Sequence, residues 1–207
     1  MADSFTQVPP NSTGNKVRTR TKVIGVDTVH EQAVFQTALP TYYALADNVA
    51  FATNKQLITV LNAAGSGKML AIKKLFLINV QTAAVTGVAL RSDVRRITAH
   101  SGGTVITPVA ADSNNAALPA EVTVRTGATS VTEGAIMFPL AYSNDEIGAT
   151  QAFPSSILLQ GLNFIPEGIE TQEIRLRPGE GITLKQITAT TLGLFAYLIV
   201  FTVDEDV

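Results

Sequence analysis

The residues that most resemble a chemical motif are Gly65-Ser66-Gly67-Lys68, which invite comparison with a phosphate-binding loop. A complete loop of that kind has a glycine five residues before its last glycine, and a serine or threonine after the lysine to hold Mg²⁺. In this chain those two positions hold Asn62 and Met69. The surrounding pattern also predicts a strand, a turn and a strand, with no helix N-terminus to hold phosphate. We therefore interpret the segment as a turn between strands.

The other candidate catalytic or metal-binding residues are few. The two histidines, His30 and His100, lack the spacing of zinc ligands, and we interpret His100 as a solvent-facing residue of a loop that ends at Thr104. The acidic clusters Asp145-Glu146 and Asp204-Glu205-Asp206 do not match a calcium-binding loop. The chain has no cysteine and no Gly-x-Ser-x-Gly sequence. We expect no enzymatic activity, no metal and no cofactor.

The composition weighs against sugars, nucleic acids and membranes as partners. The chain has no tryptophan and 6% aromatic residues, so flat surfaces on which sugars or unpaired bases stack are scarce. The net charge of −2 does not indicate attraction to nucleic acid. The longest apolar run, residues 192–203, is too short to span a bilayer. Because only 15% of the residues are charged, the surface is suited to contacts with protein partners or with copies of itself.

The elements expected from the sequence are strands. The chain has 25 threonines, and threonine and valine suit the pleated surface of a sheet. About eight runs with turn signals between them predict an all-β fold, an antiparallel β-sandwich of the jelly-roll type. The clearest runs are Leu57–Leu61, Leu70–Val80, Gly87–Thr98, Val122–Arg125, Ala135–Tyr142, Glu173–Arg177, Ile182–Lys185 and Gly193–Val203.

Three local features refine this prediction. Residues 70–80 and 87–98 should pair as antiparallel neighbours, because the connection between them is short. Pro139 lacks a backbone donor, so the strand that contains it should be an edge strand or a bulged strand. Residues 31–55 are ambiguous, since Tyr42–Ala46 fits a helical turn as well as a short strand.

The N-terminal segment carries a ladder of cations. In an extended conformation one face would hold four basic residues: Lys16, Arg18, Arg20 and Lys22. Such a ladder either docks on an acidic partner or protects an exposed edge strand, and both interpretations stay open. We expect residues 1–25 to form an extended N-terminal arm and residues 26–207 to form one β-sandwich domain.

The final strand is apolar on both faces. One face holds Leu194, Ala196, Leu198 and Val200, and the other holds Phe195, Tyr197, Ile199 and Phe201. A strand of a simple sandwich needs only one apolar face, so a chain segment or another subunit must cover the second. We predict that the aromatic face, Phe195, Tyr197, Ile199 and Phe201, forms a subunit interface.

Several stretches resemble a group of virion proteins of tailed bacteriophages of about this length. The stretches are Gln81–Leu90 with Arg95–Ala99, Ser101–Val109, Leu118–Ala128 and Arg177–Leu184. The resemblance covers roughly residues 57–203, and its motifs are strands and turns rather than catalytic residues.

The resemblance implies a capsid cement protein, also called a decoration protein. Such a protein sits on the outer capsid surface, commonly as a trimer, and clamps neighbouring capsomers built from the major capsid protein. We expect the protein to be made in the host cytoplasm and to end up on the virion, with Lys16, Arg18, Arg20 and Lys22 in contact with the shell. Two alternatives stay open: a tail, neck or fibre-base component, and a carbohydrate-binding module that recognises the host.

Overall fold

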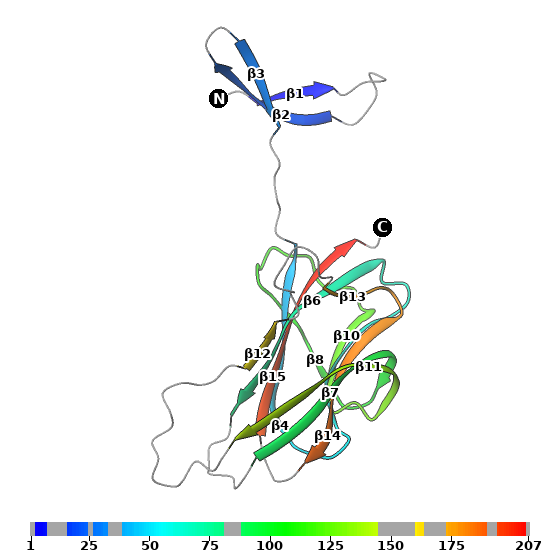
Figure 1. The fold of residues 1–207 in the computed structure, drawn as a ribbon. Helices are drawn as coiled ribbons and strands as arrows, with labels where there is room; N and C mark the ends of the chain where they lie inside the picture. Colours follow the sequence, from blue (N-terminus) through cyan, green and yellow to red (C-terminus); the bar gives the residue numbers. More distant parts are fainter. Residues whose placement is uncertain are drawn as a thin grey trace. The chain divides into compact units, whose positions relative to one another are not determined.

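The computed structural model describes residues 3–7, 16–24, 27–32, 39–80, 88–144, 160–163, 173–189 and 194–205. The chain divides into two compact units, Met1–Ala38 and Leu39–Val207. Every regular element in the described residues is a strand, which confirms the all-β prediction (Figure 1). There are fifteen of these strands, more than the sequence suggested, because several are only two to four residues long.

The first unit contains a three-stranded antiparallel sheet. Its strands, in the order in which they pair, are β1 (Asp3–Gln7), β2 (Lys16–Ile24) and β3 (Asp27–Gln32). The predicted cation ladder falls on β2, where Arg20 pairs with Asp3 on one side and with Glu31 on the other. Whether residues 1–25 act as an arm stays a prediction.

The second unit is built from two antiparallel sheets. Sheet I has the order β11 (Ser130–Asn144), β7 (Val88–Ser101), β14 (Glu180–Ala189), β5 (Gln56–Asn62), β10 (Val122–Thr126) and β8 (Thr104–Ile106). Sheet II has the order β12 (Gln160–Asn163), β6 (Lys68–Asn79), β15 (Leu194–Glu205), β4 (Thr41–Ala50) and β9 (Val109–Ala110), and β13 (Ile174–Leu176) also pairs with β6.

One hydrophobic core joins the two sheets, which confirms the predicted β-sandwich. Sheet I contributes Ile58, Val60, Val94, Val124, Ile182 and Leu184, and sheet II contributes Tyr42, Ala44, Leu70, Ile72, Tyr197 and Phe201. Two pairs of stacked rings lie in this core, Tyr42 with Phe201 and Phe51 with Phe195. The jelly-roll topology stays a prediction.

The predicted pairing of residues 70–80 with residues 87–98 is wrong. The first segment is β6 of sheet II, which pairs with β15, and the second is β7 of sheet I, which pairs with β11 and β14. The turn at Pro178-Gly179 likewise connects β13 of sheet II to β14 of sheet I. A short connection fixes how far apart two strand ends lie, but it does not place both strands in the same sheet.

The strand that contains Pro139 is both an edge strand and a bulged one, as predicted. Among the described strands β11 pairs only with β7, and its register shifts between Thr132 and Phe138. The bulges also interrupt the alternation of inward and outward side chains along β11, because Ile136 is 52% exposed whereas Met137, Phe138 and Leu140 pack against the core.

The ambiguous segment forms a strand. Residues 42–46 lie in β4, where Tyr42, Ala44 and Ala46 are buried and the residues between them are exposed. Asn48 has a positive φ of 51°, and beyond it the alternation shifts so that Val49 is the next buried residue.

Candidate functional site

The predicted subunit-interface residues lie inside the protein. β15 runs through the middle of sheet II, and the side chains of Phe195, Tyr197, Ile199 and Phe201 are at most 1% exposed in the core shared with sheet I. The sequence identified two apolar faces correctly, but it could not tell which one points inward. The opposite face of β15 reaches the outside only in part, because Leu194 is 36% exposed whereas Ala196 and Val200 are 2% and 7% exposed.

The outward face of sheet II carries a band of apolar side chains, which we call the apolar row. Its members are Tyr43 and Leu45 on β4, Leu198 and Val200 on β15, and Phe76 on β6. The register places Leu198 opposite both Leu45 and Phe76, and it places Val200 opposite Tyr43. Leu45 is 48% exposed and Tyr43 is 42% exposed, so the row presents apolar surface to the outside along β4. Leu198 and Phe76 are half-buried, and Val200 is 7% exposed.

Polar groups border the apolar row. The ammonium group of Lys74 lies 5.8 Å from the centre of the Phe76 ring, within reach of a cation–π contact. Asp47 is exposed on β4, two residues after Leu45. An apolar centre with a polar rim is typical of a protein–protein contact surface.

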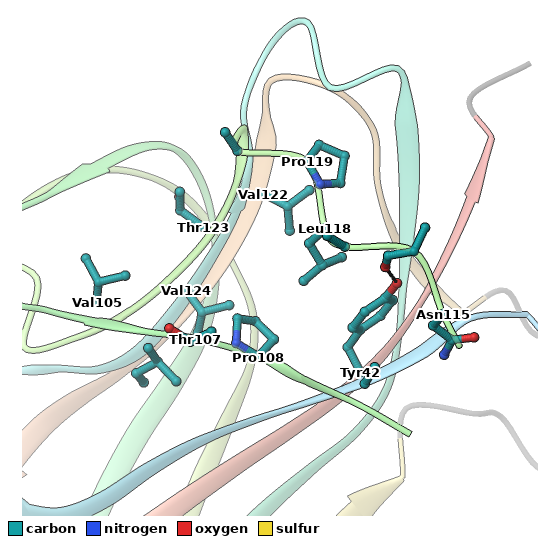
Figure 2. Close-up of a pocket in the computed structure, with 15 residues that line it drawn as sticks. Tyr42, Val105, Thr107, Pro108, Asn115, Leu118, Pro119, Val122, Thr123 and Val124 are labelled. Atoms are coloured by element: carbon teal, nitrogen blue, oxygen red, sulfur yellow. Dashed lines mark hydrogen bonds between the residues drawn. The ribbon is translucent and has the colours of Figure 1, made fainter. Parts of the chain in front are cut away.

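A pocket of about 440 Å³ opens beside the edge of sheet I (Figure 2). Aliphatic side chains and prolines form most of its wall: Ile106, Pro108, Leu118, Pro119, Val122 and Val124. Tyr42 also lines it, and the Tyr42 hydroxyl donates a hydrogen bond of 2.5 Å to the carbonyl of Ala116, which holds the loop that roofs the pocket.

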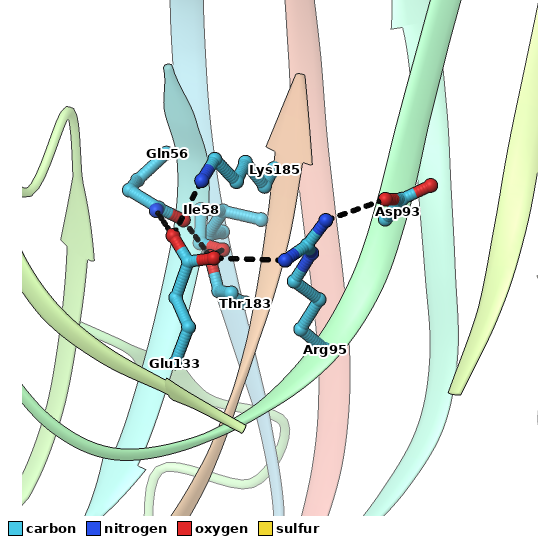
Figure 3. Close-up of polar contacts among 7 residues, drawn as sticks. All are labelled: Gln56, Ile58, Asp93, Arg95, Glu133, Thr183 and Lys185. Atoms are coloured by element: carbon cyan, nitrogen blue, oxygen red, sulfur yellow. Dashed lines mark hydrogen bonds and ion pairs between the residues drawn. The ribbon is translucent and has the colours of Figure 1, made fainter. Parts of the chain in front are cut away.

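A polar cluster on sheet I has the carboxylate of Glu133 at its centre (Figure 3). Glu133 Oε1 accepts hydrogen bonds from Gln56 Nε2 and Lys185 Nζ, each at 2.7 Å, and Glu133 Oε2 accepts one from Arg95 at 3.0 Å. Arg95 also pairs with Asp93 at 2.9 Å. The cluster therefore joins β11, β7, β14 and β5.

The charges of this polar cluster balance, which favours a structural role over catalysis. Burial alone would raise the pKa of Glu133. This effect is outweighed by the hydrogen bonds from Lys185 and Gln56 and by the charges of Lys185 and Arg95, so the pKa lies below its usual value. A carboxylate held ionised by two cations is a weak base, and it is poorly suited to take up a proton from a substrate.

His100 is not the solvent-facing loop residue that the sequence suggested. It lies in β7, and its two ring nitrogens are each 2.7 Å from a threonine hydroxyl, Nδ1 from Thr59 and Nε2 from Thr123. Burial, together with the positive charge of Arg125, lowers the pKa of His100 to about 4. The ring is therefore a neutral bridge between strands at neutral pH.

The structure brings none of the predicted site residues together into a chemical site. Lys16, Arg18, Arg20 and Lys22 follow one another on β2 of the first unit, whereas the aromatic face of β15 belongs to the second unit. No group of three or more acidic or histidine side chains capable of holding a metal occurs in the described residues. In the same part of the chain no helix is long and apolar enough to cross a membrane.

The sequence missed the features that the structure places on the surface. Tyr43 and Leu45 fell in the ambiguous segment, although their alternation with Tyr42 and Ala44 was a usable signal. The pocket and the Glu133 cluster depend on residues far apart in the chain, and they leave no local signal. The comparisons add no further guide, because no family model, no curated protein and no solved structure matches the chain.

Proposed function

We propose that the chain is a non-enzymatic structural protein of a bacteriophage virion, a cement protein that binds the outer capsid surface and clamps neighbouring capsomers. The apolar row on the outward face of sheet II is the observation that carries the proposal. The likeness of residues 57–203 to tailed-phage virion proteins supplies the setting, and the row supplies a surface suited to adhesion.

The apolar row supports adhesion through burial of apolar surface. Covering Tyr43 and Leu45, which are 42% and 48% exposed, removes apolar area from water at about 25 cal/mol per Å². Because the row lies on paired strands, its backbone is already ordered before binding, so mainly side-chain ordering opposes the contact. A trimer would repeat this contact three times, and multivalent attachment would strengthen it.

The cations of β2 are proposed as polar contacts to the major capsid protein. In the register of the sheet, Lys16 pairs with Gln7, Arg18 with Phe5 and Lys22 with Val29. Arg20, by contrast, lies between the acidic positions Asp3 and Glu31. We propose that Lys16, Arg18, Arg20 and Lys22 together supply these contacts.

Binding to empty capsid shells of the parent phage tests the proposal. Leu45→Glu places a charge in the middle of the apolar row, and we expect it to weaken binding at least about tenfold in a co-sedimentation titration. Ile136→Glu is the matched control, because Ile136 is 52% exposed on β11 of the other sheet, and it should bind as the wild type does. Equal binding by Leu45→Glu and wild type would overturn the role of the row.

A further inference from the structure

We propose that the pocket beside β8 and β10 binds an extended peptide segment of a partner protein, one that carries an aliphatic side chain next to lysine or arginine. This inference uses a different face from the apolar row, and it does not depend on the capsid role. It rests on three features of the described residues: the wall of the pocket, the edge of the sheet beside it, and the charge of its surroundings.

The wall selects an aliphatic, uncharged group. Leu118 and Pro108 line the pocket, together with the core residues Val122 and Val124, which are 6% and 0% exposed (Figure 2). No charged residue lines the pocket, and the one phenol, Tyr42, already donates its hydrogen bond to Ala116. A volume of about 440 Å³ falls within the range of roughly 300–1,000 Å³ that ligand pockets occupy.

The edge of the sheet selects an extended backbone. β8 pairs with β10 through Thr104, Val105 and Ile106, and it is the last strand of sheet I in the described residues. Val105 is 57% exposed, and both Val105 and Ile106 line the pocket. A segment that pairs with the open edge of β8 would bring alternate side chains to the pocket, as in recognition by strand addition.

The surroundings select basic flanking residues. Residues 103–124 contain two acidic residues, Asp112 and Glu121, and no lysine, arginine or histidine. Both acidic residues are exposed, and each lies within two residues of the pocket wall. The nearest following cation, Arg125, donates a hydrogen bond to the carbonyl of Gly102. The resulting negative rim complements a peptide whose aliphatic residue lies beside lysine or arginine.

The test uses the full chain and a fluorescent peptide of the sequence Thr-Lys-Val-Leu-Val-Lys-Thr, blocked at both ends. We expect anisotropy titration to give saturable binding, and a version with glutamate in place of both lysines to bind at least about tenfold more weakly at low salt. Hydrogen exchange at residues 104–106 should slow when the lysine peptide is added. Absence of saturation at millimolar peptide would overturn the proposal.

Variants separate the pocket from non-specific binding. Leu118→Glu should abolish peptide binding, whereas Ile136→Glu should leave it unchanged. Because Leu118 also packs against the core, a second variant that combines Asp112→Asn with Glu121→Gln tests the rim alone, and it should lose the preference for lysine over glutamate peptide. Retained preference in that variant would contradict the role of the rim.

Sedimentation velocity of the wild-type chain without peptide tests whether a second copy of this chain occupies the pocket instead. The proposal predicts that the chain does not self-associate through the pocket, so Leu118→Glu should leave the sedimentation coefficient unchanged. Association that Leu118→Glu does remove would assign the pocket to a second copy of this chain, and it would overturn the partner that we propose.

Discussion

Glu133 and Lys185 form an ion pair of 2.7 Å between β11 and β14, although β7 lies between these two strands in the sheet. The contact is possible because β11 bulges near Glu133, which lets the carboxylate reach over its neighbour. The bulged edge strand is thereby fixed to the middle of sheet I by side chains as well as by its backbone.

The Glu133 cluster should stabilise the fold. Glu133→Gln removes the charge that both Lys185 and Arg95 face, and these three side chains are only 17–22% exposed. We expect the free energy of unfolding to fall by about 1–3 kcal/mol in urea denaturation at pH 7. The exposed Glu121→Gln is the control, with an expected change below about 0.5 kcal/mol, and an equally small effect of Glu133→Gln would contradict the assignment.

The same cluster predicts a pH dependence. Because the pKa of Glu133 lies below its usual value in the folded protein, its contribution is present above the unfolded pKa and is lost as the pH falls through the folded pKa. The stability gap between the wild type and Glu133→Gln should therefore be full at pH 7 and should narrow below about pH 4. A gap that is constant down to pH 2 would show that the carboxylate charge is not the cause.

His100 should make the protein less stable as the pH falls toward 4. Burial and the Arg125 charge lower the pKa of His100 to about 4, whereas an unfolded histidine titrates near 6.5, so the unfolded state binds more protons between these values. His100 should add a slope of at most about 1.4 kcal/mol per pH unit to the free energy of unfolding, and His100→Gln should remove this slope.

Two measurements check the role of His100. An NMR titration of the ring protons should give a pKa of about 4, and a value near 6.5 would contradict the buried bridge to Thr59 and Thr123. His30→Gln is the matched control, because His30 lies on β3 of the first unit whereas His100 lies in the second. In that variant the free energy of unfolding of the second unit should depend on pH as it does in the wild type.

The hydroxyl of Tyr197 should be dispensable for stability. It is buried, it has no hydrogen-bond partner among the described residues, and burial raises the pKa of Tyr197 well above its usual value. Tyr197→Phe should therefore leave the stability unchanged or raise it by up to about 1–2 kcal/mol, whereas Tyr197→Ala should cost about 3–5 kcal/mol. A loss above about 1 kcal/mol in Tyr197→Phe would reveal a hydrogen bond to that hydroxyl.

Gly181 should resist substitution because two strands crowd it. A Cβ atom there would lie 2.4 Å from the carbonyl oxygen of Val60 and 2.7 Å from Ile97. Gly181→Ala should lower the melting temperature sharply, with a cost of about 2–4 kcal/mol. Gly134→Ala is the control, since its Cβ would first meet an atom at 3.4 Å, and a similar loss in both variants would contradict the crowding argument.

The fold class follows from local patterns, whereas the arrangement of the strands does not. Alternation and threonine content predicted strands that the structure contains, such as β5, β10 and β15. Alternation repeats every two residues in either sheet of a sandwich. It therefore could not assign β6 and β7 to different sheets, and it could not say which face of β15 points inward.

The candidate surfaces were harder to predict than the fold, for a related reason. His100 appeared exposed because two glycines follow it, but its environment is set by Thr59 and Thr123 on strands from elsewhere in the chain. Glu133 likewise gains its partners only through a bulge and the order of the strands. Long-range contacts of this kind leave no mark in a local pattern.

The claim that the chain is a capsid cement protein is tested most directly by native mass spectrometry. The purified chain is measured alone, and empty capsid shells of the parent phage are measured after saturation with the chain. The cement proposal predicts a trimer in isolation and hundreds of copies on each shell. About a dozen copies or fewer, or a chain that does not bind shells, would contradict it and would favour a tail, neck or fibre-base position.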